Sequence, residues 1–287
     1  MCGIAGIMTV GGEAPSVTAL QAMGAAIAHR GPDGSGHYRS GDVAMVQTRL
    51  AIIDLATGDQ PLHERGGAAL IANGEIYNYV ELRAALSATG VAFSTGSDCE
   101  PPLHLYRRHG LDFTEHLRGM YVIALHDPVA GRLVLARDPF GIKPLYYVET
   151  ATCFAFASEP QALIAGGLAS ALLVRQVRNE LLQLQFTTGR ETIFGGIQRV
   201  LPGETVVVTR GRVVERRRRE ALPAAGPTAR DDAEALSSFD RVFADSVLVH
   251  QRADVPYGMF LSGGIDSSAV LAMMARLNQR PVKAFTV

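Results

Sequence analysis

The chain has 287 residues, which at roughly 150 residues per domain suggests two domains. Its 27 Lys and Arg residues nearly balance 28 Asp and Glu residues, which argues against a dedicated nucleic-acid-binding protein. The sequence has no apolar run of about 18 residues and no leader with a basic start, so we expect a cytoplasmic protein without a membrane partner. Three cysteines are too few for a disulfide framework, and zinc-binding spacings are absent.

The first 210 residues alternate short strand-like runs with glycine turns and two helical patterns. Strands are predicted at 2–8, 43–47, 68–72, 121–126, 133–137 and 153–157. Apolar residues recur at helical spacing over 19–27 and 79–86. A hairpin over 204–214 is expected to close the domain, which we assign to residues 2–210. Strands interspersed with a few helices indicate a layered α+β fold.

A Pro-, Ala- and Gly-rich linker over 221–231 precedes a second region, 232–287. Its first helix can be capped by Asp231 or Asp232. A strand at 257–261, a glycine turn, a helix near 267–277 and a strand at 282–287 follow, and such a βαβ unit makes its strands parallel. Parallel sheets are normally buried on both faces and need more strands, so we expect this chain to be a piece of a longer protein.

Cys2 is the first chemical lead. A cysteine near a terminus is more often a small buried apolar residue than a catalytic one. If Met1 is removed, however, Cys2 carries a thiol and a free α-amino group, whose ordinary pKa is about 7.7–8.0. This amine can accept the thiol proton near neutral pH, so that one residue supplies both nucleophile and base.

Three further polar positions suggest a binding site. Asn73 and Gly74 follow a strand-like run, and an Asn amide with a glycine N–H can form an oxyanion hole, although an ordinary Asn-Gly turn is the alternative. Arg49 can clamp a carboxylate and Asp98 can hold an ammonium group. Either charge alone is more often solvated or a helix cap, and spacing does not join these residues into one site.

Five motifs together resemble the class II glutamine amidotransferase domain. They are MCGIAG at 1–6, HRGPD at 29–33, RLAIID at 49–54, NGEIYN at 73–78, and RD at 137–138 with GIKPLYY at 141–147. The resemblance covers about residues 2–210 and implies the N-terminal-nucleophile fold, a four-layer α/β/β/α sandwich. One departure is the pair Pro101 and Pro102, where the family usually has aliphatic residues; proline is tolerated in a first helical turn.

The resemblance also implies a role for each polar residue. Cys2 would attack the side-chain amide of glutamine, and Asn73 and the Gly74 N–H would form the oxyanion hole. Arg49 would bind the α-carboxylate of glutamine and Asp98 its α-amino group. Backbone around three residues would line the pocket: Ile52, Ile53 and Glu75. A glutamyl thioester would form as ammonia leaves, and water would release glutamate.

A second motif, FLSGGIDSS at 260–268, follows a predicted strand and opens a predicted helix. Glycines let the backbone approach phosphate oxygens, and a helix N-terminus favours anions. The motif is not a Walker A loop, because no Gly-Lys-Ser/Thr follows; the alternative is that Asp266 or Ser267 merely caps the helix. In its full context the motif resembles the pyrophosphate loop of the ATP pyrophosphatase superfamily, which implies an α/β parallel-sheet domain of the adenine nucleotide α-hydrolase-like type.

By that resemblance, ATP or its pyrophosphate contacts Leu261, Ser262, Gly263, Gly264, Asp266 and Ser267. Asp266 would act through Mg²⁺, and Val287 falls where the next strand lines the adenine. A glutaminase domain followed by this loop is the domain order of the glutamine-hydrolysing asparagine synthetases. That family uses glutamine, aspartate and MgATP, forms β-aspartyl-AMP, and releases asparagine, AMP and pyrophosphate.

Several alternatives stay open. Related enzymes amidate other carboxylates, the chain can act as a glutaminase alone, or it can be a non-catalytic module that senses glutamine or nucleotide. Intact Cys2, Asn73 and Asp98 count against the sensor. Six arginines within 210–219 are interpreted as a solvated strand edge and not as a nucleic-acid site. The oligomeric state is also open, a homodimer being one alternative.

Overall fold

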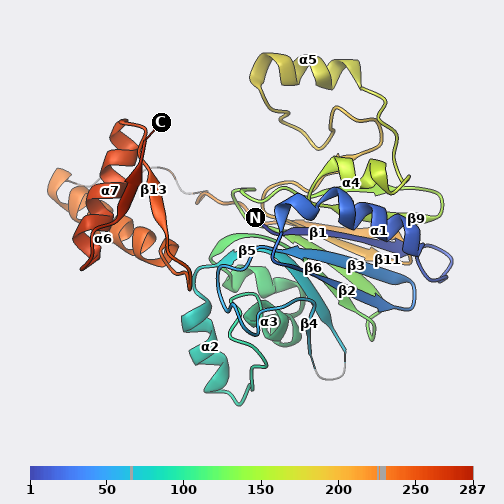
Figure 1. The fold of residues 1–287 in the computed structure, drawn as a ribbon, viewed down its shortest axis with the longest axis horizontal. Coiled ribbons are helices and arrows are strands. Elements are labelled where there is room, and N and C mark those ends of the chain that lie inside the picture. Colours follow the sequence, from blue (N-terminus) through green and yellow to red (C-terminus); the bar gives the residue numbers. More distant parts are fainter. Residues whose placement is uncertain (65–66, 225, 227–230, 287) are drawn as a thin grey trace. The chain divides into compact units, whose positions relative to one another are not determined.

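The computed structural model describes residues 1–64, 67–224, 226 and 231–286 (Figure 1). The chain divides into two compact units. Unit 1 comprises Met1–Ala51 and Ala56–Ala221, and unit 2 comprises Ile52–Leu55 and Leu222–Val287. Among the helices of the described residues, none combines the length and apolarity that crossing a membrane requires.

Unit 1 is built around two six-stranded antiparallel sheets. In spatial order, the first sheet contains Gln198–Arg199 (β10), Tyr146–Glu149 (β8), Cys153–Ala157 (β9), Gly3–Thr9 (β1), Val43–Arg49 (β3) and Gly34–Ser40 (β2). The second contains Arg212–Arg218 (β12), Glu204–Thr209 (β11), Arg132–Arg137 (β7), Gly119–Asp127 (β6), Ala69–Ile76 (β5) and Leu62–His63 (β4).

Helices cover the outer face of each sheet (Figure 1). Val17–Ala26 (α1) and Pro160–Ala165 (α4) pack on the first sheet, and Tyr79–Ser87 (α2) and Pro101–His109 (α3) pack on the second. A third apolar core lies between the two sheets. The remaining helical segments are Ala28–Arg30 (η1), Gly110–His116 (η2) and Arg175–Leu184 (α5). The layers therefore run α/β/β/α, which confirms the fold predicted for this region.

Strand β3 shows how the layers follow from side-chain alternation. Val43 and Met45 point into the core between the sheets, whereas Ala44 and Val46 pack with α1. A strand buried on both faces gives a continuous apolar run, which is why β3 could be predicted from the sequence. The same alternation directs Gln47, and after it the last residue of the strand, toward the layer between the sheets.

Some elements differ from the sequence prediction. Strand β2 was not predicted because its glycines and polar residues hide the pattern, and its core-facing Tyr38 is the one large apolar side chain. Helix α3 begins at Pro101, and the two prolines occupy its first positions, where their missing N–H groups are not needed. The departure from the family pattern is thus compatible with a normal helix start.

Unit 2 contains Asp232–His250 (α6), Gly258–Phe260 (β13), Ile265–Leu277 (α7) and Lys283–Phe285 (β14). Strands β13 and β14 pair in parallel, as expected for a βαβ unit. Asp231 caps α6 by accepting the Glu234 N–H at 2.7 Å. Helix α7 begins two residues earlier than predicted, since the chain turns helical directly after Gly264. Five residues of the predicted linker, 225 and 227–230, and the adenine contact predicted at Val287 lie outside the described residues.

Candidate active site

The Cys2 thiol lies beside the end of strand β3. The antiparallel pairing of Gly3 with Thr48 brings the two chain segments together. The Leu50 N–H donates to Cys2 Sγ at 3.3 Å, and the thiol lies 3.5 Å from the Leu50 carbonyl oxygen. Arg30 Nε donates to the Cys2 carbonyl oxygen at 3.0 Å. The half-buried sulfur is therefore held by backbone contacts on a rigid strand end.

The HRGPD motif supports this strand end. A side chain at Gly31 would bring its Cβ within 2.3 Å of the Thr48 carbonyl carbon, so only glycine allows this approach. The Asp33 N–H donates to the Arg49 carbonyl oxygen, and the Asp33 carboxylate accepts the Ala51 N–H, both at 2.9 Å. The motif therefore fixes the backbone that contacts the Cys2 sulfur.

Gly74 holds a backbone N–H outside the sheet ladder. It pairs with Tyr121 on β6, whose carbonyl oxygen accepts the Asp138 N–H at 2.8 Å on the far side. In an antiparallel pair this orientation leaves the two residues without mutual hydrogen bonds, so the Gly74 N–H faces the opposite edge of β5. A Cβ at Gly74 would lie 2.2 Å from the Met120 carbonyl oxygen, which excludes any larger residue.

The neighbouring N–H groups on this edge of β5 are occupied. The Ala72 N–H donates to Gln60 Oε1 at 2.6 Å, and the Ile76 N–H donates to Asp98 Oδ2 at 2.8 Å. The Gly74 N–H stands between these two bonds in the same row. It thus faces the same side of β5 as the Gln60 and Asp98 side chains.

The Asn73 side chain is a buried donor. It is 1% exposed, and its Nδ2 atom has no hydrogen-bond partner among the described residues. An unsatisfied buried donor costs about 1–3 kcal/mol, which a substrate oxygen would recover. The Gln47 side chain is equally buried, and neither of its amide atoms has a partner in the described part of the chain. The sequence alone predicts no role for Gln47. An amide side chain directly after the apolar run 43–46 was the feature that could have indicated one.

Asp98 is buried, and its surroundings disfavour the ionised form of its carboxyl group. Burial raises the pKa of its carboxyl group to about 6, against the Ile76 hydrogen bond, and the nearby Glu75 carboxylate acts in the same direction as burial. An ammonium group from a ligand would satisfy the ionised form, because opposite charges favour it. Burial also raises the pKa of the adjacent Cys99 thiol, and electrostatic interactions with Asp98 and Cys2 raise it further.

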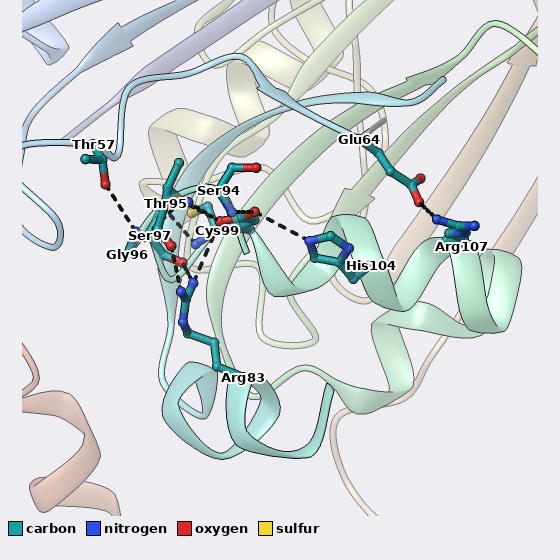
Figure 2. A network of polar contacts seen from close by, with 11 residues as sticks. Thr57, Glu64, Arg83, Ser94, Thr95, Gly96, Ser97, Cys99, His104 and Arg107 are labelled. Atoms are coloured by element: carbon teal, nitrogen blue, oxygen red, sulfur yellow. Dashed lines mark hydrogen bonds and ion pairs between the residues drawn. The ribbon is translucent and has the colours of Figure 1, made fainter. Parts of the chain in front are cut away.

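The loop that carries Asp98 is held by a polar network (Figure 2). Glu100 accepts the N–H groups of Ser94 and Thr95 at 2.7 and 2.8 Å, and the Thr95 hydroxyl at 2.6 Å. Arg83 donates to the Thr95 and Ser97 carbonyl oxygens. Burial acts to raise the pKa of Glu100, but these hydrogen bonds lower it overall. The loop conformation is thus tied to an ionised carboxylate.

Arg49 reaches the same strand end as Cys2 and is paired with an acid. Its Nη1 atom donates to Asp59 Oδ1 at 2.7 Å; the guanidinium is buried, while the Asp59 side chain is 82% exposed.

Ile52 and Ile53 belong to unit 2, where the Asp254 N–H donates to the Ile52 carbonyl oxygen at 2.9 Å. Their predicted place in the glutamine pocket remains a prediction.

The RD and GIKPLYY motif builds a tight loop. Asp138 is fully buried and accepts three backbone N–H groups, from Phe140, Ile142 and Lys143. Arg137 donates to three carbonyl oxygens, of Gly141, Lys143 and Val200. Both backbone groups of Lys143 are therefore fixed by the preceding Arg-Asp pair. Lys143 lies within the motif at 141–147, but the sequence alone predicts no role for it.

In unit 2 the SGGIDSS segment leaves a helix start uncapped. Gly263 has a φ of 78°, which favours glycine, and Gly264 is the N-cap of α7 with no side-chain hydrogen bond. The alternative that Asp266 or Ser267 caps this helix is therefore wrong. The hydroxyl groups of Ser262 and Ser267 lie 3.1 Å apart. The uncapped N–H groups and paired hydroxyls are suited to phosphate oxygens.

The described residues contain no cluster of three or more His, Cys, Asp or Glu side chains that could hold a metal by themselves. Magnesium in nucleotide sites, however, is usually held by one or two carboxylates together with substrate phosphates. The single carboxylate of Asp266, in the first turn of α7, fits that requirement.

Comparison with known proteins identifies the family. Residues 1–218 match the family model for the glutamine amidotransferase domain, and residues 238–287 match the model for asparagine synthase. The chain belongs to the glutamine amidotransferase domain family. Among solved structures, the glutamine phosphoribosylpyrophosphate amidotransferase of B. subtilis superposes with a TM-score of 0.57 and 19% identity, over 99% of this chain and 65% of that chain. This likeness shows that the two chains share a fold.

Curated relatives carry two kinds of name. Asparagine synthetase [glutamine-hydrolyzing] 1 of Bacillus subtilis is 34% identical over 292 residues, 100% of this chain and 46% of the relative. The putative asparagine synthetase of Mycobacterium tuberculosis is 38% identical, over 88% of this chain and 41% of its own length. Amidase chry2 of Gibberella zeae is 34% identical, over 99% and 44% respectively. The chain thus spans less than half the length of these relatives.

Proposed function

We propose that this amidotransferase hydrolyses the side-chain amide of L-glutamine at Cys2 and supplies ammonia to an ATP-dependent amidation. The observation that carries the proposal is that adjacent residues hold two donors: the buried Asn73 Nδ2, which has no partner among the described residues, and the Gly74 N–H, which points out of the β5–β6 ladder. Neighbouring backbone and side-chain N–H donors are what an acyl-transfer oxyanion requires.

The proposed reaction begins after removal of Met1. The α-amine of Cys2 accepts the thiol proton, and the thiolate attacks the side-chain carbonyl carbon of glutamine. Asn73 and Gly74 stabilise the oxyanion of the tetrahedral intermediate. The intermediate collapses to a γ-glutamyl thioester as the amide nitrogen takes the proton from the α-ammonium and leaves as ammonia. Water then cleaves the thioester, which releases glutamate and restores the thiol.

Recognition of glutamine is proposed to use two opposite charges. Arg49 binds the α-carboxylate and Asp98 binds the α-ammonium, which together distinguish the free amino acid from a glutamine residue inside a peptide. The Glu100 network supports this role because it fixes the loop on both sides of Asp98. Backbone near Ile52, Ile53 and Glu75 completes the proposed pocket.

For unit 2 we propose binding of MgATP at Leu261, Ser262, Gly263, Gly264, Asp266 and Ser267. Val287 belongs to the same proposal as the adenine contact. The uncapped start of α7 would receive phosphate oxygens, and Asp266 would hold the Mg²⁺ that accompanies the nucleotide. The acceptor we favour is aspartate, activated as β-aspartyl-AMP and amidated to asparagine. The match of residues 238–287 to asparagine synthase supports this choice.

A second candidate is the amidation of a different carboxylate, kept open because some relatives carry a name other than asparagine synthetase, namely amidase. The deciding experiment supplies glutamine, MgATP and aspartate to the full-length protein and measures asparagine and pyrophosphate. Asparagine formation that requires aspartate supports the first candidate. Pyrophosphate release that does not depend on aspartate rejects it and directs the search to other carboxylates.

A thiol-trapping glutamine analogue separates an enzyme from a sensor. Covalent addition detected by mass spectrometry on the native chain, and absent from Cys2→Ala, supports the proposed nucleophile. Reversible glutamine binding without covalent trapping or turnover would instead identify a sensor.

A further inference from the structure

The GIKPLYY motif presents one charged side chain whose role the proposed glutamine reaction leaves open. Asp138 binds the Lys143 N–H at 3.1 Å, and Arg137 Nε binds the Lys143 carbonyl oxygen at 2.7 Å. Because both backbone groups are fixed by buried charges, the direction in which the Lys143 side chain leaves the loop is fixed as well. Such immobilisation is typical of a group that must hold one position.

The Lys143 ammonium ends beside the amino terminus. The residue is 6% exposed, and its Nζ atom lies 3.4 Å from Sδ of Met1. An ammonium group has three donors, and a thioether is a weak acceptor. Among the described residues, Met1 Sδ is the one hydrogen-bond partner found for this ammonium. The contact partner is therefore the residue whose removal the proposed mechanism requires.

Charges of both signs surround this ammonium. Burial lowers the pKa of Lys143, while electrostatic interactions with Glu75 and Cys2 raise it and the interaction with Arg30 lowers it. The Asp138 carboxylate also raises it. Burial likewise lowers the pKa of the chain's amino terminus, and Arg30 and Lys143 lower it further, against opposing effects of Cys2 and Asp33.

We propose that Lys143 is a positioning residue for the nucleophile, whose fixed ammonium makes the N-terminal Cys2 give up its first proton at lower pH. A neighbouring positive charge disfavours the state of Cys2 with an α-ammonium and a neutral thiol, which carries a net charge of about +1. It favours the states with one proton fewer, in which the thiolate or the free amine needed for attack is present. The inference rests on the proposed role of Cys2.

The test measures alkylation of Cys2 by iodoacetamide as a function of pH, on chains from which Met1 is absent by intact mass. The reaction needs the thiolate and does not need glutamine, so it reports on Lys143 even if glutamine hydrolysis fails. Cys99 and Cys153 are buried, so Cys2 is the expected site of alkylation. Loss of the modification in Cys2→Ala identifies that site. We expect Lys143→Met to raise the midpoint of the alkylation profile by about one pH unit, the lower end of the range for a nearby charge.

Two variants separate charge from packing. Lys143→Arg keeps the positive charge and is expected to keep the midpoint near that of the native chain. Lys283→Met removes an exposed lysine from unit 2 and should leave the midpoint unchanged. If Lys143→Met does not fold, Lys143→Gln takes its place as the neutral variant. An unmoved midpoint in a folded neutral variant, or an equal shift in Lys143→Arg, overturns the proposal.

Discussion

The Leu50 N–H and the Cys2 sulfur lie 3.3 Å apart, which couples the thiol directly to the strand end that carries Arg49. The sulfur and the guanidinium are thereby held by adjacent residues of one backbone segment. The HRGPD motif also fixes this segment, because Asp33 forms hydrogen bonds with the backbone of Arg49 and Ala51. A nucleophile and a carboxylate-binding group held on one rigid element can keep their separation through a catalytic cycle.

The raised pKa of Asp98 predicts a pH-dependent affinity for glutamine. The carboxylate must be ionised to hold an ammonium group, and its pKa in the free chain is about 6. As pH falls below about 6, the protonated form predominates and KM for glutamine should rise about tenfold per pH unit. Steady-state kinetics between pH 5 and 8 check this expectation.

Asp98→Asn is the matched control for that pH dependence. Loss of a charge-assisted hydrogen bond of about 1.5–3 kcal/mol should raise KM roughly 10- to 100-fold above pH 6 and remove the dependence below it. A variant that keeps the native pH profile of KM would show that another group binds the ammonium.

The unpartnered Asn73 amide predicts a selective loss of kcat. Asn73→Ala removes one oxyanion donor, which should lower kcat by about 10²–10³, or about 2.7–4 kcal/mol in the barrier, with little change in KM. Asn78→Ala is the control: its amide bridges the His116 carbonyl oxygen and the Arg118 N–H. That change should lower the melting temperature of the protein and have little effect on kcat. Equal kinetic effects in both variants would reject the oxyanion role.

The ion pair between Arg49 and Asp59 predicts competition with substrate. Asp59 is exposed and binds the guanidinium that we propose binds the α-carboxylate of glutamine. Asp59→Asn removes this competing charge and should lower KM for glutamine, by a factor of about 2–5 for a partly exposed pair worth up to about 1 kcal/mol. Asp112→Asn, which breaks the exposed pair with Arg217, is the control and should leave KM unchanged. A higher KM in Asp59→Asn would mean that the pair positions Arg49 instead.

The buried Glu100 carboxylate predicts a pH-sensitive contribution to stability. Its pKa is lowered in the folded chain by hydrogen bonds from Ser94 and Thr95, although burial opposes them. The stabilisation is therefore present above its ordinary pKa of 4.5 and is lost as pH falls through the lower folded value. Glu100→Gln should destabilise unit 1 by about 1.5–3 kcal/mol at pH 7.

Urea denaturation at pH 7 and near pH 3 measures this difference, which should shrink at the lower pH. The exposed Glu220→Gln variant is the control and should be within about 0.5 kcal/mol of the native chain at both values. A destabilisation by Glu100→Gln that is the same at both pH values would contradict an ionised role for this residue.

The sequence predicted the buried layers better than the connections between site residues. Strands such as β3 and β9 are apolar on both faces and could be recognised from composition. Strand β2 could not be recognised, because it has a single buried residue. The orientation of the Gly74 N–H depends on the β5–β6 register, and no local pattern encodes that register. The same limit applies to Lys143, whose approach to the amino terminus joins residues 142 positions apart.

The most direct test of the account is ammonia release from glutamine by this 287-residue chain, with Cys2→Ala measured in parallel and Met1 removal verified by intact mass. We predict release of one ammonia per glutamate with the native chain and none above background with Cys2→Ala. Equal release by both chains, or no release by a folded chain that lacks Met1 and binds glutamine, would contradict Cys2 as the nucleophile of a glutaminase site.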